Sequence, residues 1–154
     1  MKKILMIWSL LFIFFGCVEE STPVSSTESL NPGILTGVVD GTSWTLIQGR
    51  VISSKLNPGE YTFDFWGESL SDICDDYTYS SERSLFGSFK LEEGEVSFDN
   101  LNNITIFYDN TNLVATTGRL VITKIESDKV TGYLAASYNS ANEVTGEFEL
   151  TKCD

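Results

Sequence analysis

Apolar and polar residues alternate along most of residues 33–154, in short runs that end at turn residues. In Tyr61–Phe65, for example, three aromatic side chains alternate with Thr62 and Asp64. Successive side chains of a β-strand point to opposite faces, so this period of two predicts strands with one apolar face. No long stretch shows the period of 3.6 residues that is typical of an amphipathic helix. The alternation therefore predicts a single all-β domain over residues 33–154.

The number and spacing of these runs indicate the architecture of the domain. We expect eight or nine short strands joined by tight turns, of which Asp40-Gly41 is a strong hairpin signal. Such a series is typical of an antiparallel β-sandwich, and a closed up-and-down β-barrel is the alternative. The apolar faces supply about twenty inward side chains, enough for one core. Thr42–Ser54 is long for one strand, and we expect a bend near Gly49.

The last two runs resemble each other. Val130–Leu134 reads VTGYL and Val144–Phe148 reads VTGEF, fourteen residues later. Two short copies are too few for a repeat architecture, so we interpret them as a terminal β-hairpin with its loop at Asn139–Glu143. Gly132 and Gly146 then allow bending, or the close approach of a neighbouring strand.

The N-terminal residues have a different pattern. Lys2 and Lys3 precede Ile4–Phe15, which is twelve residues long and apolar except for Ser9. As a helix this run would span about 18 Å, well short of the ~30 Å apolar core of a bilayer. A basic start followed by a short apolar run and a small residue is typical of a secretory signal peptide.

The end of this segment resembles the lipobox of bacterial lipoproteins, which closes with Gly or Ala followed by Cys. Gly16-Cys17 matches that ending, while Phe14 and Phe15 stand where the family usually has Leu and a small residue. The resemblance implies removal of residues 1–16 and attachment of a diacyl lipid, with chains such as palmitate, to the Cys17 thiol. The alternatives are an ordinary signal peptide cut elsewhere and a short membrane anchor.

The residues after the expected cleavage site suggest where the domain would lie. Val18 is not the Asp that this family associates with inner-membrane retention, so the resemblance implies the outer membrane where the cell has one, on its periplasmic or surface-exposed side. Six of the fifteen residues in Val18–Pro32 are Ser or Thr and three are Glu, which is typical of a flexible linker. Residues 17–32 would therefore be the lipidated cysteine and its tether.

Charge and residue types exclude several classes of function. Without Lys2 and Lys3 the chain has 8 basic and 22 acidic residues, a side-chain charge of −14. This negative charge argues against binding to nucleic acid, whose phosphates are also negative, and the chain should be repelled by anionic lipid surfaces. The sequence contains no histidine, which excludes Ser-His-Asp and Cys-His catalysis and histidine-ligated metals.

Three functions stay open after these exclusions. We expect a non-enzymatic binding or structural module of the cell envelope, with a protein or glycan partner and no cofactor beyond the covalent lipid. A carrier of a small apolar ligand inside a β-barrel is the first alternative. An enzyme that uses carboxylates is the second, although 22 acidic residues provide many accidental pairs.

The three cysteines are consistent with one lipid attachment and one disulfide. If Cys17 carries lipid, Cys74 and Cys153 remain, and an oxidising compartment permits them to pair. Their bond would contribute up to about 4–5 kcal/mol of stability in the chain-entropy model. Cys153 shares its parity with polar residues of the last strand, so we expect it to face away from the core. Two unpaired thiols are the alternative, and no metal site is expected.

Glu68–Arg83 is the longest stretch without a strand pattern, and it is rich in acidic and aromatic residues. Its carboxylates lack the spaced order of a known calcium loop, so a solvated loop is the simpler interpretation. Aromatic side chains beside carboxylates can also recognise sugars or peptides, or they can cover an edge of the core. The candidate binding surface comprises Trp66, Asp72, Asp75, Asp76, Tyr77 and Tyr79.

Overall fold

The computed structural model describes residues 33–75 and 82–153 and confirms the all-β class. These residues form eleven strands and no helix, so they contain no helix long and apolar enough to cross a membrane. The strands are β1 (Thr36–Val39), β2 (Thr42–Thr45), β3 (Gln48–Ser53), β4 (Tyr61–Trp66), β5 (Ser84–Phe89), β6 (Gly94–Ser97), β7 (Ile104–Tyr108), β8 (Thr111–Ala115), β9 (Thr117–Ile125), β10 (Lys129–Asn139) and β11 (Asn142–Lys152).

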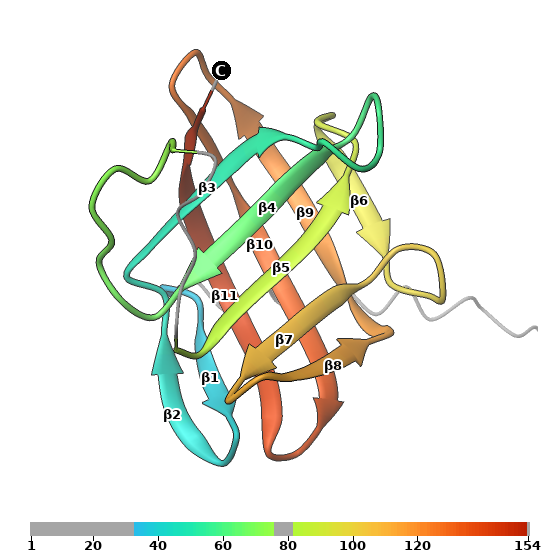
Figure 1. Cartoon of the computed structure of the whole chain (residues 1–154). Coiled ribbons are helices and arrows are strands. Elements are labelled where there is room, and N and C mark those ends of the chain that lie inside the picture. The colour runs from blue at the N-terminus through green and yellow to red at the C-terminus, as the bar shows by residue number, and fades with distance from the viewer. Residues whose placement is uncertain (1–32, 76–81, 154) are drawn as a thin grey trace, which may run out of the picture.

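All eleven described strands belong to one strongly curled sheet. The order along the sheet is β6-β9-β10-β11-β3-β4-β5-β7-β8, and the β1–β2 hairpin pairs with β11 beside this path. The curl carries β3, β4 and β5 across the front of β9, β10 and β11 (Figure 1). One pair departs from the expected antiparallel arrangement, because Thr151 and Lys152 of β11 run parallel to Arg50 and Val51 of β3.

The segment expected to form one bent strand is instead two strands, β2 and β3; nine strands form the main path of the sheet, and β1 and β2 lie beside it. The break lies at Leu46-Ile47 and not at Gly49. The Leu46 amide donates to the Leu35 carbonyl and the Ile47 amide donates to the Trp66 carbonyl, both at 2.9 Å. The chain therefore exchanges β1 for β4 as its partner at this point, and Gly49 lies inside β3.

The turn between β1 and β2 forms as predicted. Asp40 and Gly41 have φ angles of 52° and 67°, both in the left-handed region. Two residues in that conformation are typical of the tight turn whose twist matches that of the flanking strands.

The terminal hairpin and its glycines are confirmed, with a shorter turn than the expected Asn139–Glu143 loop. β10 ends at Asn139 and β11 begins at Asn142. A Cβ on Gly132 would overlap the carbonyl oxygen of Val121 on β9 and then the ring of Phe148, and one on Gly146 would crowd the backbone next to Ile34. These glycines thus allow the close approach of a neighbouring strand and a ring, and of the incoming N-terminal segment.

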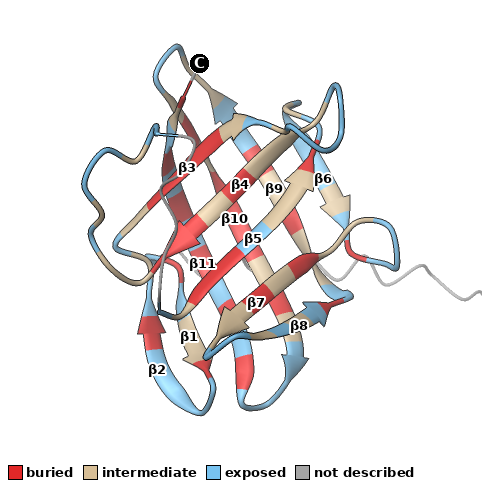
Figure 2. Ribbon diagram, in the orientation of Figure 1, coloured by how far each residue is buried: buried red, intermediate tan, exposed pale blue. Residues whose placement is uncertain are grey.

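The core lies inside the curl of the sheet. Buried and exposed residues alternate along β11 (Figure 2), and twenty buried apolar residues of the described chain form one cluster. The Phe65 ring on β4 meets the Phe148 ring on β11 edge-on, with centroids 5.4 Å apart. Phe89 contacts Phe63 edge-on at 5.7 Å and stacks on Phe98 at 5.9 Å. Aromatic rings from both layers therefore meet in the interior.

Candidate functional site

The outer face of β3, β4, β5 and β7 carries a row of residues that lie opposite one another in register. Arg50 pairs with Asp64, Asp64 with Phe86, and Phe86 with Thr105. These residues have the opposite parity to the core residues of the same strands, so their side chains lie on the outside of the sheet. The row thus combines an ion pair, an aromatic ring and a hydroxyl group across four strands.

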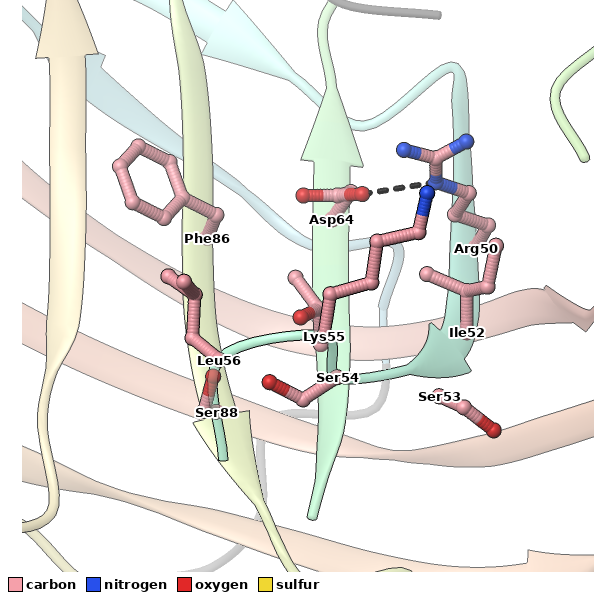
Figure 3. Close-up of a pocket in the computed structure, with 10 residues that line it drawn as sticks. Arg50, Ile52, Ser53, Ser54, Lys55, Leu56, Asp64, Phe86 and Ser88 are labelled. Carbon is pink, nitrogen blue, oxygen red and sulfur yellow. Dashed lines mark hydrogen bonds and ion pairs between the residues drawn. The ribbon is translucent and has the colours of Figure 1, made fainter. Parts of the chain in front are cut away.

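A hollow of about 360 Å³ lies over this row (Figure 3). Lys55 points toward the Arg50–Asp64 pair, while Leu56 and Phe86 lie together on the other side. The hollow is lined by Arg50, Ile52, Ser53, Ser54, Lys55, Leu56, Thr62, Asp64, Phe86 and Ser88.

A second hollow of about 420 Å³ adjoins the first, because Phe86 and Ser88 line both. It lies between the β3–β4 turn and the segment that precedes β7, and its further lining residues are Asn57, Pro58, Glu60, Gly87, Leu101, Asn103 and Thr105. We refer to the two adjoining hollows together as the outer groove. Three apolar side chains on it meet solvent, since Leu56 is 91% exposed, Leu101 89% and Phe86 37%.

Arg50 forms one wall of the outer groove and is itself only 4% exposed. Its Nε donates to Asp64 Oδ2 at 2.8 Å, and its Nη1 donates to the carbonyls of Ile73 at 2.8 Å and Asp75 at 2.6 Å. The guanidinium also lies over the Trp66 ring, 5.3 Å from its centroid. Arg50 therefore fastens the loop after β4 onto the outer face of the sheet.

Asp64 is the carboxylate of this pair. Burial raises the pKa of Asp64 above its ordinary value of 3.8, while the hydrogen bond and the positive charge of Arg50 act to lower it. Burial has the larger effect because a charged carboxylate loses water when it is enclosed. Asp64 is thus held as the partner of a cation in a poorly hydrated place.

The predicted pairing of Cys74 with Cys153 is confirmed: the two residues form a disulfide with Cα atoms 5.4 Å apart. The Cys153 amide donates to the Val51 carbonyl at 2.8 Å, which continues the contact of β11 with β3. Cys153 is buried but does not belong to the core cluster described above. The disulfide is a second fastening, beside Arg50, for the loop after β4.

The aromatic part of the predicted binding surface is corrected at Trp66. Trp66 is 3% exposed and the Arg50 guanidinium lies over its ring, so it presents almost no surface for recognition. Trp44 is likewise buried, and its indole Nε1 donates to the Arg83 carbonyl at 3.0 Å.

The acidic part of that surface is only partly described. Asp72 and Asp75 are exposed on the loop, where the Asp75 amide donates to the Asp72 carbonyl at 3.1 Å. Within residues 33–75 and 82–153 no three acidic or cysteine side chains gather in a way that could hold a metal ion. The remaining predicted site residues, Cys17, Asp76, Tyr77 and Tyr79, lie outside the described residues.

The residues of the outer groove were not among the predicted site residues. Leu56 and Leu101 stand in polar turn segments, and Phe86 has the outward parity of a strand whose inward positions are Leu85 and Phe89. An apolar residue in a polar turn, or at an outward strand position, is the sequence signal that could have indicated the groove. That signal is weak, because exposed apolar residues are common on proteins. Only their gathering on one face makes them informative.

A third hollow of about 490 Å³ lies on the outer face of the back layer, among β1, β9, β10 and β11. Gly37 and Gly118 line it. A Cβ on Gly37 would overlap the Glu143 carbonyl oxygen, and one on Gly118 would overlap that of Ala135. Close packing of the strands thus explains why both positions are glycine. The hollow lies where these two residues have no side chain.

Comparisons with known proteins found no counterpart: no family model, no curated protein and no solved structure matches the chain.

Proposed function

We propose that this chain is a lipid-anchored protein of the bacterial cell envelope whose β domain is a non-enzymatic binding module. The observation that carries the proposal is the order of residues at the N-terminus: two lysines, a short apolar run, and Gly16-Cys17. Two or three acyl chains on one cysteine would hold a protein durably at a membrane, since each buried methylene contributes about 0.8 kcal/mol. The sequence after Cys17 favours the outer membrane where one exists.

The disulfide supports an extracytoplasmic location. Cys74 and Cys153 are 79 residues apart in the sequence, yet they are joined at the end of β11. Structural disulfides persist in oxidising compartments and are rare in the cytosol of ordinary bacteria. A pair placed in this way fits a protein that folds after export.

The outer groove supports binding in preference to the two alternatives. Among the described residues, Asp64 is the one carboxylate that lines the first hollow and it is paired with Arg50, while Glu60 lines the second hollow. Carboxylate-based glycosidases instead need two acids that face each other across a cleft. The rings of Phe65 and Phe148 meet in the interior, in space that a barrel carrier would need for a ligand. Exposed apolar side chains gathered around a groove are typical of interaction surfaces.

Lipid attachment is tested by growing cells with a clickable palmitate analogue. The wild-type protein should carry the label and sediment with membranes, whereas Cys17→Ala should lose both properties. The matched control is Cys74→Ala/Cys153→Ala, which removes the other two cysteines and should keep the label. Label retained by Cys17→Ala, or lost from the control, would contradict the proposal.

A further inference from the structure

We propose that two copies of this chain associate through the free edge of β8, which pairs with β8 of the second copy in an antiparallel ladder. This contact is separate from the outer groove, because it uses the backbone at the edge of the sheet and not the side chains on its outer face. The proposal therefore goes beyond the binding role inferred above.

The path of described strands begins at β6 and ends at β8, so the sheet has edges whose backbone groups have no neighbouring strand. Of the described strands, β2, β6 and β8 each pair with one neighbour only. Such an edge is a template for a strand of another chain, and proteins usually protect it with charged side chains, prolines or bulges. The three edges differ in this protection.

Two of the three edges carry charged groups. β6 contains Glu95 and directly follows two further glutamates. Beside β2, the Arg83 carbonyl accepts a hydrogen bond from the Trp44 indole, and the Arg83 guanidinium forms an ion pair with Asp40 at 3.4 Å. Both edges are therefore flanked by groups that would lose water or meet charge if another strand were added.

β8 has none of these protections. It reads TNLVA, without a charged residue or a proline, and it pairs with β7 without a bulge. The nearest charged residues in sequence are Asp109 and Arg119, which have opposite signs. Charges more than about 8 Å away are largely screened at physiological salt, so the net charge of the chain acts weakly at this edge. β8 is thus the edge best suited to pair with another chain.

The β7–β8 hairpin determines which backbone groups of β8 point away from β7. Its two-residue turn, Asp109-Asn110, has φ angles of 43° and 58°, so the flanking Tyr108 and Thr111 form a hydrogen-bonded pair. Hydrogen-bonded and non-hydrogen-bonded pairs alternate along an antiparallel ladder. Asn112 and Val114 therefore direct their N–H and C=O groups toward the free edge, and both residues are exposed.

These two donors and two acceptors match those of a second β8 strand. Free groups must face free groups, and the longest overlap of two β8 strands then places Asn112 opposite Val114 of the second copy. The ladder gains four backbone hydrogen bonds around a twofold axis at Leu113. Leu113 packs partly buried against the core, so the two Leu113 side chains meet on the axis. A contact of this symmetry is closed, so it ends at a dimer.

The dimer also has a consequence for the outer groove. Val114 lies opposite Thr105, the last member of the row that crosses the groove, so the added ladder continues the outer face of one copy into that of the other. A contact of five residues a side is small and weak in dilute solution. Two copies held in one membrane have a higher local concentration; this step alone rests on the proposed anchoring.

The test is disulfide cross-linking of the full-length protein in intact cells with copper phenanthroline, read on non-reducing gels. Leu113→Cys places two thiols across the axis, where Cα atoms about 4.5 Å apart suit a disulfide. Thr111→Cys is the matched control with the same parity on the same strand, because its two Cα atoms would be about 14 Å apart. We expect at least about tenfold more cross-linked dimer from Leu113→Cys, because only its Cα separation lies within disulfide range.

Cells that express Asn112→Cys and Val114→Cys together provide a second measurement that leaves Leu113 in place. Both side chains lie on the exposed outer face, and their Cα atoms should be about 5.5 Å apart between copies. The mixed pair should cross-link, and reducing agent should reverse the cross-link.

Two substitutions should prevent the cross-link of Leu113→Cys. Val114→Pro removes an N–H group that points away from β7, which an edge strand tolerates, and Val114→Lys adds a charge to the edge. The matched control is Ser97→Pro on β6. The Phe98 amide donates to the Gly118 carbonyl, so the N–H group of the neighbouring Ser97 also points to a free edge. Ser97→Pro should change the yield less than about twofold.

The inference is wrong if Leu113→Cys and the mixed pair both fail to cross-link, whether or not the protein sediments with membranes. It is also wrong if Thr111→Cys cross-links equally well, if the dimer persists in both Val114 variants, or if Ser97→Pro removes it as strongly as they do. Acyl labelling decides the anchor independently. Loss of the label with retained cross-linking contradicts the anchoring alone, and the reverse result contradicts the dimer alone.

Discussion

Replacing Arg50 with Met should destabilise the domain strongly at neutral pH. The substitution keeps much of the side-chain length but removes the donors to Asp64 and to the carbonyls of Ile73 and Asp75. Asp64 would then be a buried carboxylate without its cation. Breaking a buried ion pair in this way typically costs about 3–5 kcal/mol, which for a domain of this size lowers the melting temperature by roughly 10–25 °C.

The loss should depend on pH in a definite direction. Burial already raises the pKa of folded Asp64 above 3.8, and removing Arg50 removes both influences that lower it. A carboxyl group whose pKa is raised by folding favours the folded state when protonated, and this contribution disappears as the pH rises through the folded pKa. The difference between wild type and Arg50→Met should therefore shrink as the pH falls through the raised pKa of Asp64 in the variant.

Urea unfolding at pH 7 and at a series of lower pH values measures both effects. Adding Asp64→Asn to Arg50→Met should recover part of the stability at pH 7, because the unpaired charge is gone. The matched control is Arg119→Met: Arg119 also lies over an aromatic ring, that of Tyr133, but its ion pair with Glu95 is more exposed, so the cost should stay below about 1 kcal/mol. A loss below about 1 kcal/mol for Arg50→Met, or a loss that does not shrink anywhere as the pH falls, would refute the reasoning.

Two further predictions concern the disulfide and the terminal hairpin. Reducing the Cys74–Cys153 bond should lower the free energy of unfolding by about 2–4 kcal/mol, which calorimetry with and without reductant measures; mass spectrometry of the exported protein should find no free thiol, and two free thiols would contradict the assignment. Gly132→Ala should destabilise by about 1–3 kcal/mol or more, because its Cβ would overlap the backbone carbonyl oxygen of Val121 as well as the Phe148 ring. Gly33→Ala, which has open space, should stay within about 0.5 kcal/mol. Equal effects of the two substitutions in urea unfolding would argue against the packing described.

Local pattern predicted the parts of the fold that depend on local rules. The alternation in Tyr61–Phe65 identified β4, and Asp40-Gly41 identified the turn between β1 and β2, because strand period and turn chemistry involve neighbours in sequence. The break at Leu46-Ile47 depends on the two different strands that receive its amides. Such a change of partner leaves no period in the sequence, so the bend was expected a few residues too late.

The candidate site required the register of distant strands. The row formed by Arg50, Asp64, Phe86 and Thr105 joins residues up to 55 positions apart in sequence, and only their alignment across four strands brings them together. The sequence placed Trp66 in the candidate binding surface, but it is buried beneath the guanidinium of Arg50, which also holds the loop after β4. Loops that fold back over a sheet are set by tertiary contacts, which one unaligned sequence does not reveal.

The way in which the N-terminal segment joins the sheet determines how the domain would carry mechanical load. The Leu35 amide donates to the Glu147 carbonyl and the Glu147 amide donates to the Gly33 carbonyl, each at 2.7 Å. A pull on the tether would thus enter the fold at the middle of β11, and β10 would share it along most of that strand. Cys153, directly after the C-terminal end of β11, is joined by the disulfide to Cys74 in the loop after β4. In the proposed anchored state, a pull on the tether would therefore first reach hydrogen bonds on β11, a strand inside the sheet order, and not on one of its edge strands.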